Sequence, residues 1–373
     1  METADPDQVL APGRADLEKM RSDPSLWSEL NYEEADGVEG YPVDGNGVRR
    51  AAVLWAAQYD RRPEDLDLLR HLLEQETINH QAAHLQGISD ELRLAVYLVV
   101  RWIDSTDLKR IYEARFANFD TWFALSGIPL GDLSRPGREP VWDPAGIRRW
   151  VKEIGDVAFP KRIEEETEAE WARRARVQGM AAEAKAFLLR MLQTGPPDTG
   201  LLRFLQYELS RIGEFAEAAG VQRLLVARDN NRPYGTGSAL CRLSELELRC
   251  GNLEDAWRSL RRCVASLEND EARKLGHRPW RQLGIARHVV AQHMEIVLAS
   301  AEHYPGLAHE VVTSGAALLD ELADAPPALL ALACDAALSL SLRSMADRYD
   351  QRARGVSATE PAVVTPTSDD ARG

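Results

Sequence analysis

The sequence has 373 residues, of which 45% are hydrophobic and 28% are charged, so it can bury the core of two domains or of one extended repeat array. Its formal net charge is −14, and since binding to phosphate backbones needs a basic surface, we expect no nucleic-acid partner. The longest uninterrupted apolar run, residues 94–100, is far too short to cross a membrane. The acidic N-terminal residues include no apolar stretch typical of a secretory signal, so we expect neither a membrane nor a secretory role.

The sequence contains four cysteines, Cys241, Cys250, Cys263 and Cys334, and none of them belongs to a CxxC pair. This spacing predicts reduced, mostly buried thiols in a cytoplasmic protein. The chain also has 39 arginines but only 6 lysines, which is typical of GC-rich coding and indicates a bacterial source.

The negative charge is concentrated in residues 1–45. Twelve acidic side chains stand there against Arg14, Lys19 and Arg21, a net charge of −9, which leaves −5 for the other 328 residues. We interpret residues 1–45 as an acidic, flexible arm, because a segment of high net charge has too little apolar surface to drive folding. The alternative is that the arm attracts a basic partner protein.

Residues 46–128 show the periodicity of helices. Apolar residues recur at three- to four-residue spacing, with breaks at Pro63, at Gly87 and before Asp107. The third segment, residues 91–104, is apolar on nearly all sides and should therefore lie at the centre of the group. Four helices with short connections predict antiparallel packing, so we expect an N-terminal helical bundle over these residues.

Residues 129–144 contain four prolines and two glycines, so we expect an interdomain linker there. Helical periodicity resumes at Ala145 and includes one long helix that starts at Ile163. No segment alternates apolar and polar residues for long enough to form a sheet. We therefore expect a second helical domain over residues 145–350, followed by a disordered tail over residues 351–373, which are rich in Pro, Thr and Ser.

Two stretches of the second domain, residues 202–225 and 240–263, can be laid over one another. Gly213 then matches Gly251, and in both stretches this glycine ends a first helix. The sequences GEFAEAA and GNLEDAW open a second helix at equivalent places, with a small alanine that lets the two helices cross closely. Each stretch therefore predicts a helical hairpin.

This pattern, over residues 202–263, resembles the tetratricopeptide repeat, whose helix–turn–helix units carry small residues at such positions. The sequence departs from that family in its offset of 38 residues rather than about 34, and in Gln206 and Ser244, which stand where the family has a first-helix glycine. The resemblance implies an α-solenoid-like array whose concave surface binds another protein.

Glu76, His80 and His84 follow one another at steps of four residues, which places them on one side of a helix. Two imidazoles and a carboxylate in this arrangement could hold a divalent metal such as zinc, with a water as the fourth ligand, and make the protein a metal-dependent enzyme. However, no HExxH motif occurs, and no histidine is preceded by Glu at three residues, as a di-iron bundle site would need.

A second hypothesis places the same residues against neighbouring helices. They continue the apolar stripe that ends at Leu73, and buried polar groups are usually paired within the protein, because leaving one unpaired costs about 1–3 kcal/mol. We favour this polar seam, in which Glu76 and His80 hydrogen-bond to side chains of adjacent helices. The expected partners are Arg101, Arg115, Tyr97 or Asp104.

The stretch RFANFDTWF, residues 115–123, places polar side chains among aromatic ones. Arg115, Asn118, Asp120 and Trp122 could line a ligand pocket, since such pockets combine aromatic walls with a few polar groups. Aromatic residues also dominate protein cores, and we favour the interpretation that this stretch packs at the core end of a bundle helix.

Motifs of common enzymes are absent from the sequence: there is no GxSxG and no SxxK, and YGTGS lacks the lysine of a phosphate-binding loop. The sequence therefore predicts an all-α protein, a helical bundle followed by an α-solenoid-like array of αα-hairpins. We expect a non-catalytic, cytoplasmic scaffold without a cofactor that binds another, basic protein, as a bacterial regulatory or immunity-type protein would. The alternative is the metal-dependent enzyme, and the oligomeric state stays open.

Overall fold

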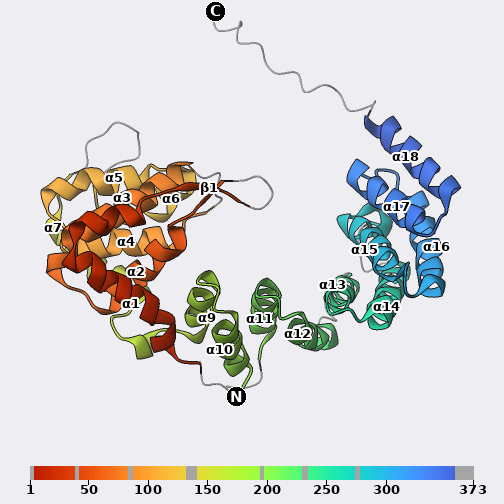
Figure 1. Ribbon diagram of the computed structural model, residues 1–373, viewed down its shortest axis with the longest axis horizontal. Coiled ribbons are helices and arrows are strands. Elements are labelled where there is room, and N and C mark those ends of the chain that lie inside the picture. Colours follow the sequence, from red (N-terminus) through yellow and green to blue (C-terminus); the bar gives the residue numbers. More distant parts are fainter. Residues whose placement is uncertain are drawn as a thin grey trace, which may run out of the picture. The chain divides into compact units, whose positions relative to one another are not determined.

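The computed structural model describes residues 4–37, 42–82, 87–131, 141–193, 197–228, 234–273 and 278–357 (Figure 1). Over these residues it is almost entirely helical, which confirms the predicted all-α fold. The chain divides into two compact units, Met1–Gly195 and Pro196–Gly373. Among the described residues, no helix is long and apolar enough to span a lipid bilayer.

The first unit combines α-helices with short 3-10 helices, one π-helical turn (η5) and one antiparallel pair of strands. Its elements in chain order are α1 (Pro6–Ser22), η1 (Pro24–Leu30), β1 (Glu34–Asp36), β2 (Pro42–Asp44), α2 (Gly47–Tyr59), η3 (Pro63–Asp65), α3 (Leu66–Ala82), α4 (Asp90–Arg101), η4 (Ser105–Asp107), α5 (Leu108–Arg115), α6 (Phe119–Ala124), α7 (Pro144–Trp150), η5 (Val151–Gly155), α8 (Asp156–Ala158), η6 (Ile163–Glu165), α9 (Glu168–Val177) and α10 (Ala181–Gln193).

The second unit is a succession of helical hairpins. Its elements are α11 (Thr199–Arg211), α12 (Phe215–Arg228), α13 (Gly235–Arg249), α14 (Leu253–Ala272), η7 (Trp280–Gln282), α15 (Gly284–Ser300), α16 (Pro305–Glu321), α17 (Pro327–Ser339) and α18 (Arg343–Ser357).

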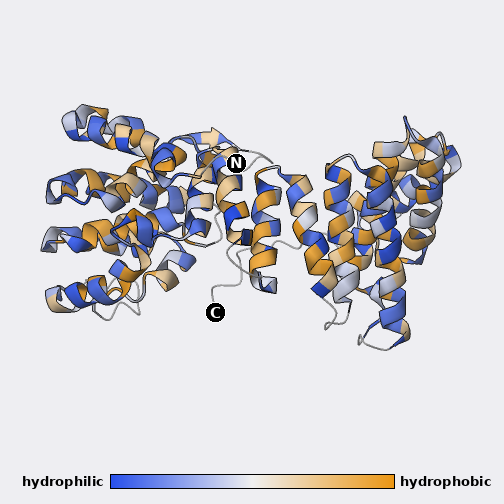
Figure 2. Cartoon of the chain, turned by 90° about the horizontal axis from the view of Figure 1, so that it is seen from below, coloured by the Kyte–Doolittle hydropathy of each residue, from blue (hydrophilic) through white to orange (hydrophobic). Residues whose placement is uncertain are grey.

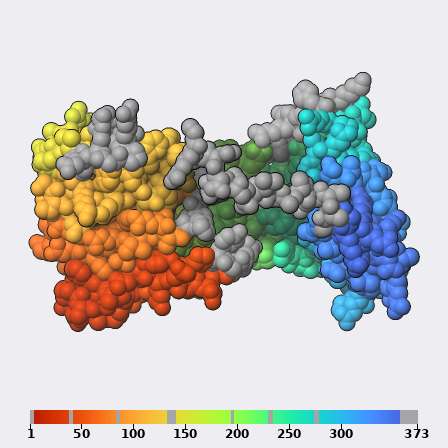
Figure 3. Space-filling view, turned by 90° about the horizontal axis from the view of Figure 1, so that it is seen from above, coloured from red at the N-terminus to blue at the C-terminus, as the bar shows by residue number. Residues whose placement is uncertain are grey.

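The expectation of a flexible arm over residues 1–45 is wrong for the described part of that segment. Helix α1 packs against α2 and buries Leu10, Leu17 and Met20, and β1 pairs with β2. Residues of α1, in red in Figure 3, adjoin the rest of the first unit. The segment folds despite its high net charge because α1 is an amphipathic helix. Its apolar residues recur at helical spacing between the acidic ones.

Two helices that the periodicity predicts as continuous are each broken. Asn118 starts α6 with a capping box, so the predicted helix from Asp107 is divided into α5 and α6. Gly179 adopts a φ of 74° between α9 and α10, and this left-handed backbone ends the predicted long helix from Ile163. In both cases a polar cap or a glycine overrides an apolar stripe that runs past it.

The described ends of the predicted linker, residues 129–131 and 141–144, lie inside the first unit, and the start of the predicted second domain belongs to that unit as well. The buried guanidinium of Arg174, in α9, lies 5.6 Å from the ring centre of Trp55 and donates a hydrogen bond of 2.9 Å to Oε1 of Gln58 in α2. This long-range contact joins α9 to the helices before the linker, so the boundary at 129–144 is corrected to the junction of Gly195 and Pro196.

The second unit confirms the helical-hairpin array. Gly213 and Gly251 have φ values of 81° and 77°, and both lie at the turns α11–α12 and α13–α14, as the overlay of the two stretches predicts. Helices α13, α15 and α17 lie side by side, and each packs against the second helix of its own hairpin. Membership of the tetratricopeptide family stays a prediction.

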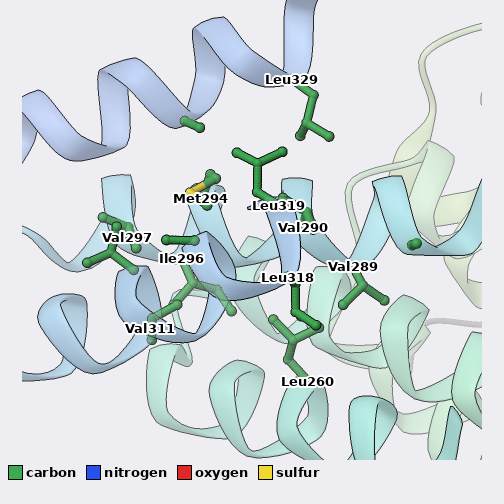
Figure 4. Close-up of a cluster of buried hydrophobic side chains, with 14 of the residues drawn as sticks. Leu260, Val289, Val290, Met294, Ile296, Val297, Val311, Leu318, Leu319 and Leu329 are labelled. Atoms are coloured by element: carbon green, nitrogen blue, oxygen red, sulfur yellow. The ribbon is translucent and has the colours of Figure 1, made fainter. Parts of the chain in front are cut away.

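The core of the second unit lies between successive hairpins. Figure 4 shows Val290 and Met294 of α15 near Leu319 of α16 and Leu329 of α17, and all four belong to one buried cluster. Burying a side chain of this size contributes about 1.5–3 kcal/mol. The helices of this unit therefore carry apolar residues on one part of their surface and polar residues on the rest, as the colours of Figure 2 show.

The predicted disordered tail, residues 351–373, begins within a helix. Helix α18 continues to Ser357 and packs against α17, and its Tyr349 is fully buried. The expectation of disorder is therefore wrong for residues 351–357, and residues 358–373 lie outside the described part of the chain.

We predict that Gly13→Ala destabilises the first unit. In an open helix this change stabilises by about 1 kcal/mol, but a Cβ at Gly13 would lie 2.1 Å from the carbonyl oxygen of Ala52 in α2. The helices must then move apart, and we expect the free energy of unfolding, measured by urea denaturation, to fall by about 1–3 kcal/mol.

The matched control is Gly220→Ala in α12, where an added Cβ meets no atom within 4 Å. This variant should be as stable as the wild type or more stable, by up to about 1 kcal/mol. A Gly13→Ala protein with unchanged or increased stability would contradict the packing of α1 on α2.

Candidate functional site

Glu76 lies in a fully buried ion cluster. Its Oε1 accepts a hydrogen bond of 2.6 Å from Nε of Arg50, and the same guanidinium binds Asp44 and the carbonyl oxygen of Leu30. Burial raises the pKa of Glu76 to about 7, and the positive charge of Arg50 opposes this rise. Arg50 is therefore the counter-ion of two buried carboxylates, Glu76 and Asp44, from different segments.

His80 is buried and both of its ring nitrogens are engaged. Nδ1 lies 2.9 Å from the carbonyl oxygen of Glu76, and Nε2 lies 3.1 Å from the backbone nitrogen of Ser89. Since a carbonyl oxygen accepts and a backbone N–H donates, this pattern requires the neutral ring with its proton on Nδ1. Burial lowers the pKa of His80, which favours the same neutral form.

The third residue of the metal hypothesis, His84, lies outside the described residues. Within the described ranges, no group of three or more His, Cys, Asp or Glu side chains is placed to hold a metal ion. Oε1 of Glu76 binds Arg50, and both ring nitrogens of His80 bind main-chain groups, so His80 presents no free nitrogen to a cation.

The predicted polar seam is present only in part: Glu76 binds a side chain of a neighbouring helix, Arg50, whereas His80 binds main-chain groups, and none of the expected partners takes part. Tyr97 and Arg101 bind Asp156, at 2.5 and 2.7 Å, instead of Glu76 or His80. Asp104 caps η4 and accepts a hydrogen bond from Arg70. The arginine that binds Glu76 comes from α2, where a charged residue inside an apolar helix was the available signal.

Three of the four predicted pocket residues have local structural roles. Asn118 caps α6 and donates to the carbonyl oxygen of His80 at 3.2 Å, while Asp120 accepts a hydrogen bond of 2.6 Å from the backbone of Gly87. Trp122 is half-buried, with its ring 5.9 Å from that of Phe119. A ligand-binding role for these residues stays a prediction.

Arg115, the fourth residue, is buried, and its Nε has no hydrogen-bond partner within the described structure. Burial lowers its pKa. The favoured core position of the neighbouring aromatic residues is wrong for two of them: Phe119 and Phe123 are 75% and 71% exposed. Because α6 is short and starts at Asn118, it turns Thr121 and Leu125 inward and these two rings outward.

A surface of the second unit has the features of a binding site. Helix α15 contacts both α13 and α17, and all three pack against the second helices of their hairpins. The side of α13, α15 and α17 that faces away from these second helices carries exposed or partly exposed residues at one position per turn. We call this surface the carboxylate face and define it by Glu245 of α13, Glu295 and Leu298 of α15, and Asp335 and Leu338 of α17.

Two carboxylates from neighbouring helices interact on the carboxylate face. Partial burial raises the pKa of Glu295, the negative charge of Glu245 raises it further, and Arg249 lowers it. Glu245 accepts a hydrogen bond of 2.5 Å from Arg242, whereas Glu295 has no hydrogen-bond or ion-pair partner in the described parts of the chain. A cation between the two carboxylates would relieve their repulsion.

Apolar groups adjoin these carboxylates. Leu298 is 41% exposed and follows Glu295 by three residues, and Leu338 is 53% exposed and follows Asp335 by the same interval. Residues three apart are neighbours on a helix surface, so each leucine lies beside a carboxylate. The face therefore offers negative charge and apolar area together.

Comparisons with protein-family models, with curated proteins and with solved structures found no match to this chain.

The carboxylate face was not predicted, although the sequence contains a signal for it. Both α15 and α17 carry an acidic residue followed three positions later by leucine, in EIVL and DAAL. Each helix is otherwise strongly apolar, so a stripe that breaks this pattern indicates the exposed side. The missing information was the order of packing, which brings Glu245 and Glu295 onto one surface.

We predict that Glu76→Gln reduces the dependence of stability on pH. The folded-state pKa of Glu76, about 7, exceeds its usual value of 4.5, so the folded protein holds an extra proton between these values and its unfolding free energy falls as pH rises through them. From about pH 5 to about pH 8 the wild type should lose on the order of 2–3 kcal/mol relative to the variant.

Urea denaturation of both proteins across this pH range measures the difference. His80, whose lowered pKa acts in the opposite direction, is unchanged in the variant and therefore cancels in the comparison. Parallel stability curves for wild type and Glu76→Gln would show that Glu76 does not titrate in this interval.

Proposed function

We propose that this protein is a non-catalytic scaffold of the bacterial cytoplasm, of a regulatory or immunity type, that binds another protein through the carboxylate face. The occupant is a basic, amphipathic helix or extended segment of the partner, whose Lys or Arg side chains lie beside Glu245 and Glu295. Its apolar side chains cover Leu298 and Leu338. A protein that acts by occupying its partner needs no catalytic group or cofactor.

The observation that carries this proposal is the approach of Glu245 and Glu295 on neighbouring helices. Like charges that lie close together raise the free energy of the folded protein, and Arg242 and Arg249 offset only part of that cost. A partner cation that contacts both carboxylates gains from each of them. Complementary charge of this kind gives specificity and a fast association rate.

The exposed leucines supply the second component of binding. Exposed apolar residues next to charged ones are typical of protein interfaces, in which a few buried apolar contacts carry most of the binding free energy. Leu298 and Leu338 lie on adjacent helices that contact each other. A segment that crosses α15 and α17 can cover both side chains.

The N-terminal acidic residues are a weaker candidate for a basic partner. Asp16 binds Arg49 at 2.7 Å, and Glu29 accepts a hydrogen bond of 2.9 Å from Lys19. Asp44 binds Arg50 in the buried cluster. Because these carboxylates already have cationic partners inside the first unit, we assign the basic partner to the carboxylate face instead.

A set of labelled peptides tests this proposal. The first peptide has lysines and leucines at helical spacing, the second replaces each lysine by glutamate, and the third replaces each leucine by serine. We expect the full-length protein to bind the first at least ten-fold more tightly than the others, measured by fluorescence anisotropy. Glu245→Gln/Glu295→Gln should weaken this binding at least five-fold, because both carboxylates are lost.

The matched control is Glu254→Gln/Asp255→Asn, which removes the same charge from an exposed and a half-buried position in the first turn of α14. We expect this control to bind the Lys/Leu peptide like the wild type. The proposal is wrong if the Lys/Leu and Glu/Leu peptides bind equally, or if the two double variants lose affinity to the same extent.

A further inference from the structure

Cys241 and Cys263 face each other across the hairpin α13–α14. Neither cysteine is in a disulfide, and Cys241 packs against the buried cluster that contains Cys263. One turn after Cys241, the hydroxyl of Ser244 donates a hydrogen bond of 2.7 Å to the carbonyl oxygen of Ala256 in α14. Cys263 is fully buried, whereas Cys241 is partly exposed. The two helices are close here, because a Cβ at Gly237, one turn before Cys241, would lie 2.5 Å from Leu267 and 3.6 Å from the carbonyl oxygen of Cys263.

We propose that Cys241 and Cys263 are a redox-modification site, at which a small disulfide such as glutathione disulfide converts the two thiols into a reversible internal disulfide. Two cysteines on helices that approach this closely need only a small movement to reach the S–S bond length of about 2 Å. Cys241 is partly exposed and Cys263 is fully buried, so the oxidant reaches Cys241 first.

The two thiols also act on each other's pKa. The hydrogen bond from Cys263 lowers the pKa of Cys241, against the effect of burial, while the same bond and burial raise the pKa of Cys263. Since the thiolate is the nucleophile in disulfide exchange and the oxidant reaches the partly exposed thiol before the buried one, Cys241 is the group that attacks and Cys263 is the group that resolves.

The reaction balances in two steps. The Cys241 thiolate attacks one sulfur of glutathione disulfide, which breaks the S–S bond of the oxidant and releases one glutathione thiolate. Cys263 then gives up its proton and attacks the Cys241 sulfur, which releases the second glutathione. The two cysteines together lose two electrons and two protons, and glutathione disulfide becomes two molecules of reduced glutathione.

The modification also affects the carboxylate face, a consequence that rests on the proposed function. Cys241 lies one turn before Glu245, and the charges of Glu245 and Glu295 both act on its thiol. Drawing Cys241 toward α14 moves this turn of α13 relative to α15. We therefore expect oxidation to change the separation of the two carboxylates and to weaken binding of the Lys/Leu peptide at least three-fold.

Mass spectrometry of the full-length protein tests the disulfide itself. The reduced protein is incubated with glutathione disulfide, its remaining thiols are blocked, and its peptides are mapped. We expect one cross-link, between Cys241 and Cys263, that is reversed by dithiothreitol. Cys263→Ser should accumulate a glutathione adduct on Cys241, because the resolving thiol is missing, while Cys241→Ser should leave Cys263 unmodified.

The matched control, Cys250→Ser/Cys334→Ser, should form the same cross-link as the wild type. A stable glutathione adduct on Cys241 of the wild type, or a cross-link to Cys250 or Cys334, would overturn the proposal. Peptide binding by the reduced protein is measured separately. A cross-link without any peptide binding would refute the proposed function alone, and binding without a cross-link would refute this inference alone.

Discussion

The first unit depends on one buried cation. The guanidinium of Arg50, inaccessible to solvent, binds Glu76 of α3, Asp44 of β2 and the carbonyl oxygen of Leu30 at the end of η1. Losing one partner of a buried ion pair costs about 3–5 kcal/mol, because the remaining charge is left without compensation. The acidic N-terminal segment is therefore part of the fold of this unit: its carboxylates serve as counter-ions for arginines of the helices behind them.

Local signals predicted a large part of the fold. Gly213 and Gly251 both end a helix with left-handed backbone, as the overlay of the two stretches predicts. The domain boundary could not be predicted in this way, because it depends on contacts such as that of Arg174 with Gln58, which are 116 residues apart. Propensity and composition describe a segment by itself, whereas a buried ion or aromatic contact is defined only when both partners have been brought together.

The candidate sites likewise combine features that the local sequence predicts with features that depend on tertiary contacts. The buried position of Glu76 and His80 follows from the apolar stripe that they continue, but their partners come from α2 and from the backbone of Ser89, which no periodicity identifies. The carboxylate face needs still more information. Its residues belong to three hairpins. Only the packing of α13, α15 and α17 side by side brings these separate acidic residues together into one negatively charged surface.

The elevated proton affinity of Glu76 also has a calorimetric consequence. Folding of the first unit near pH 6 adds a proton to Glu76, while burial of His71 and His80 releases protons, and the buffer exchanges the difference with the protein. The heat released or absorbed on folding must therefore contain the ionisation enthalpy of whichever buffer is present. Two laboratories working at the same pH in phosphate and in Tris would obtain different enthalpies for the same molecule, while agreeing on its free energy.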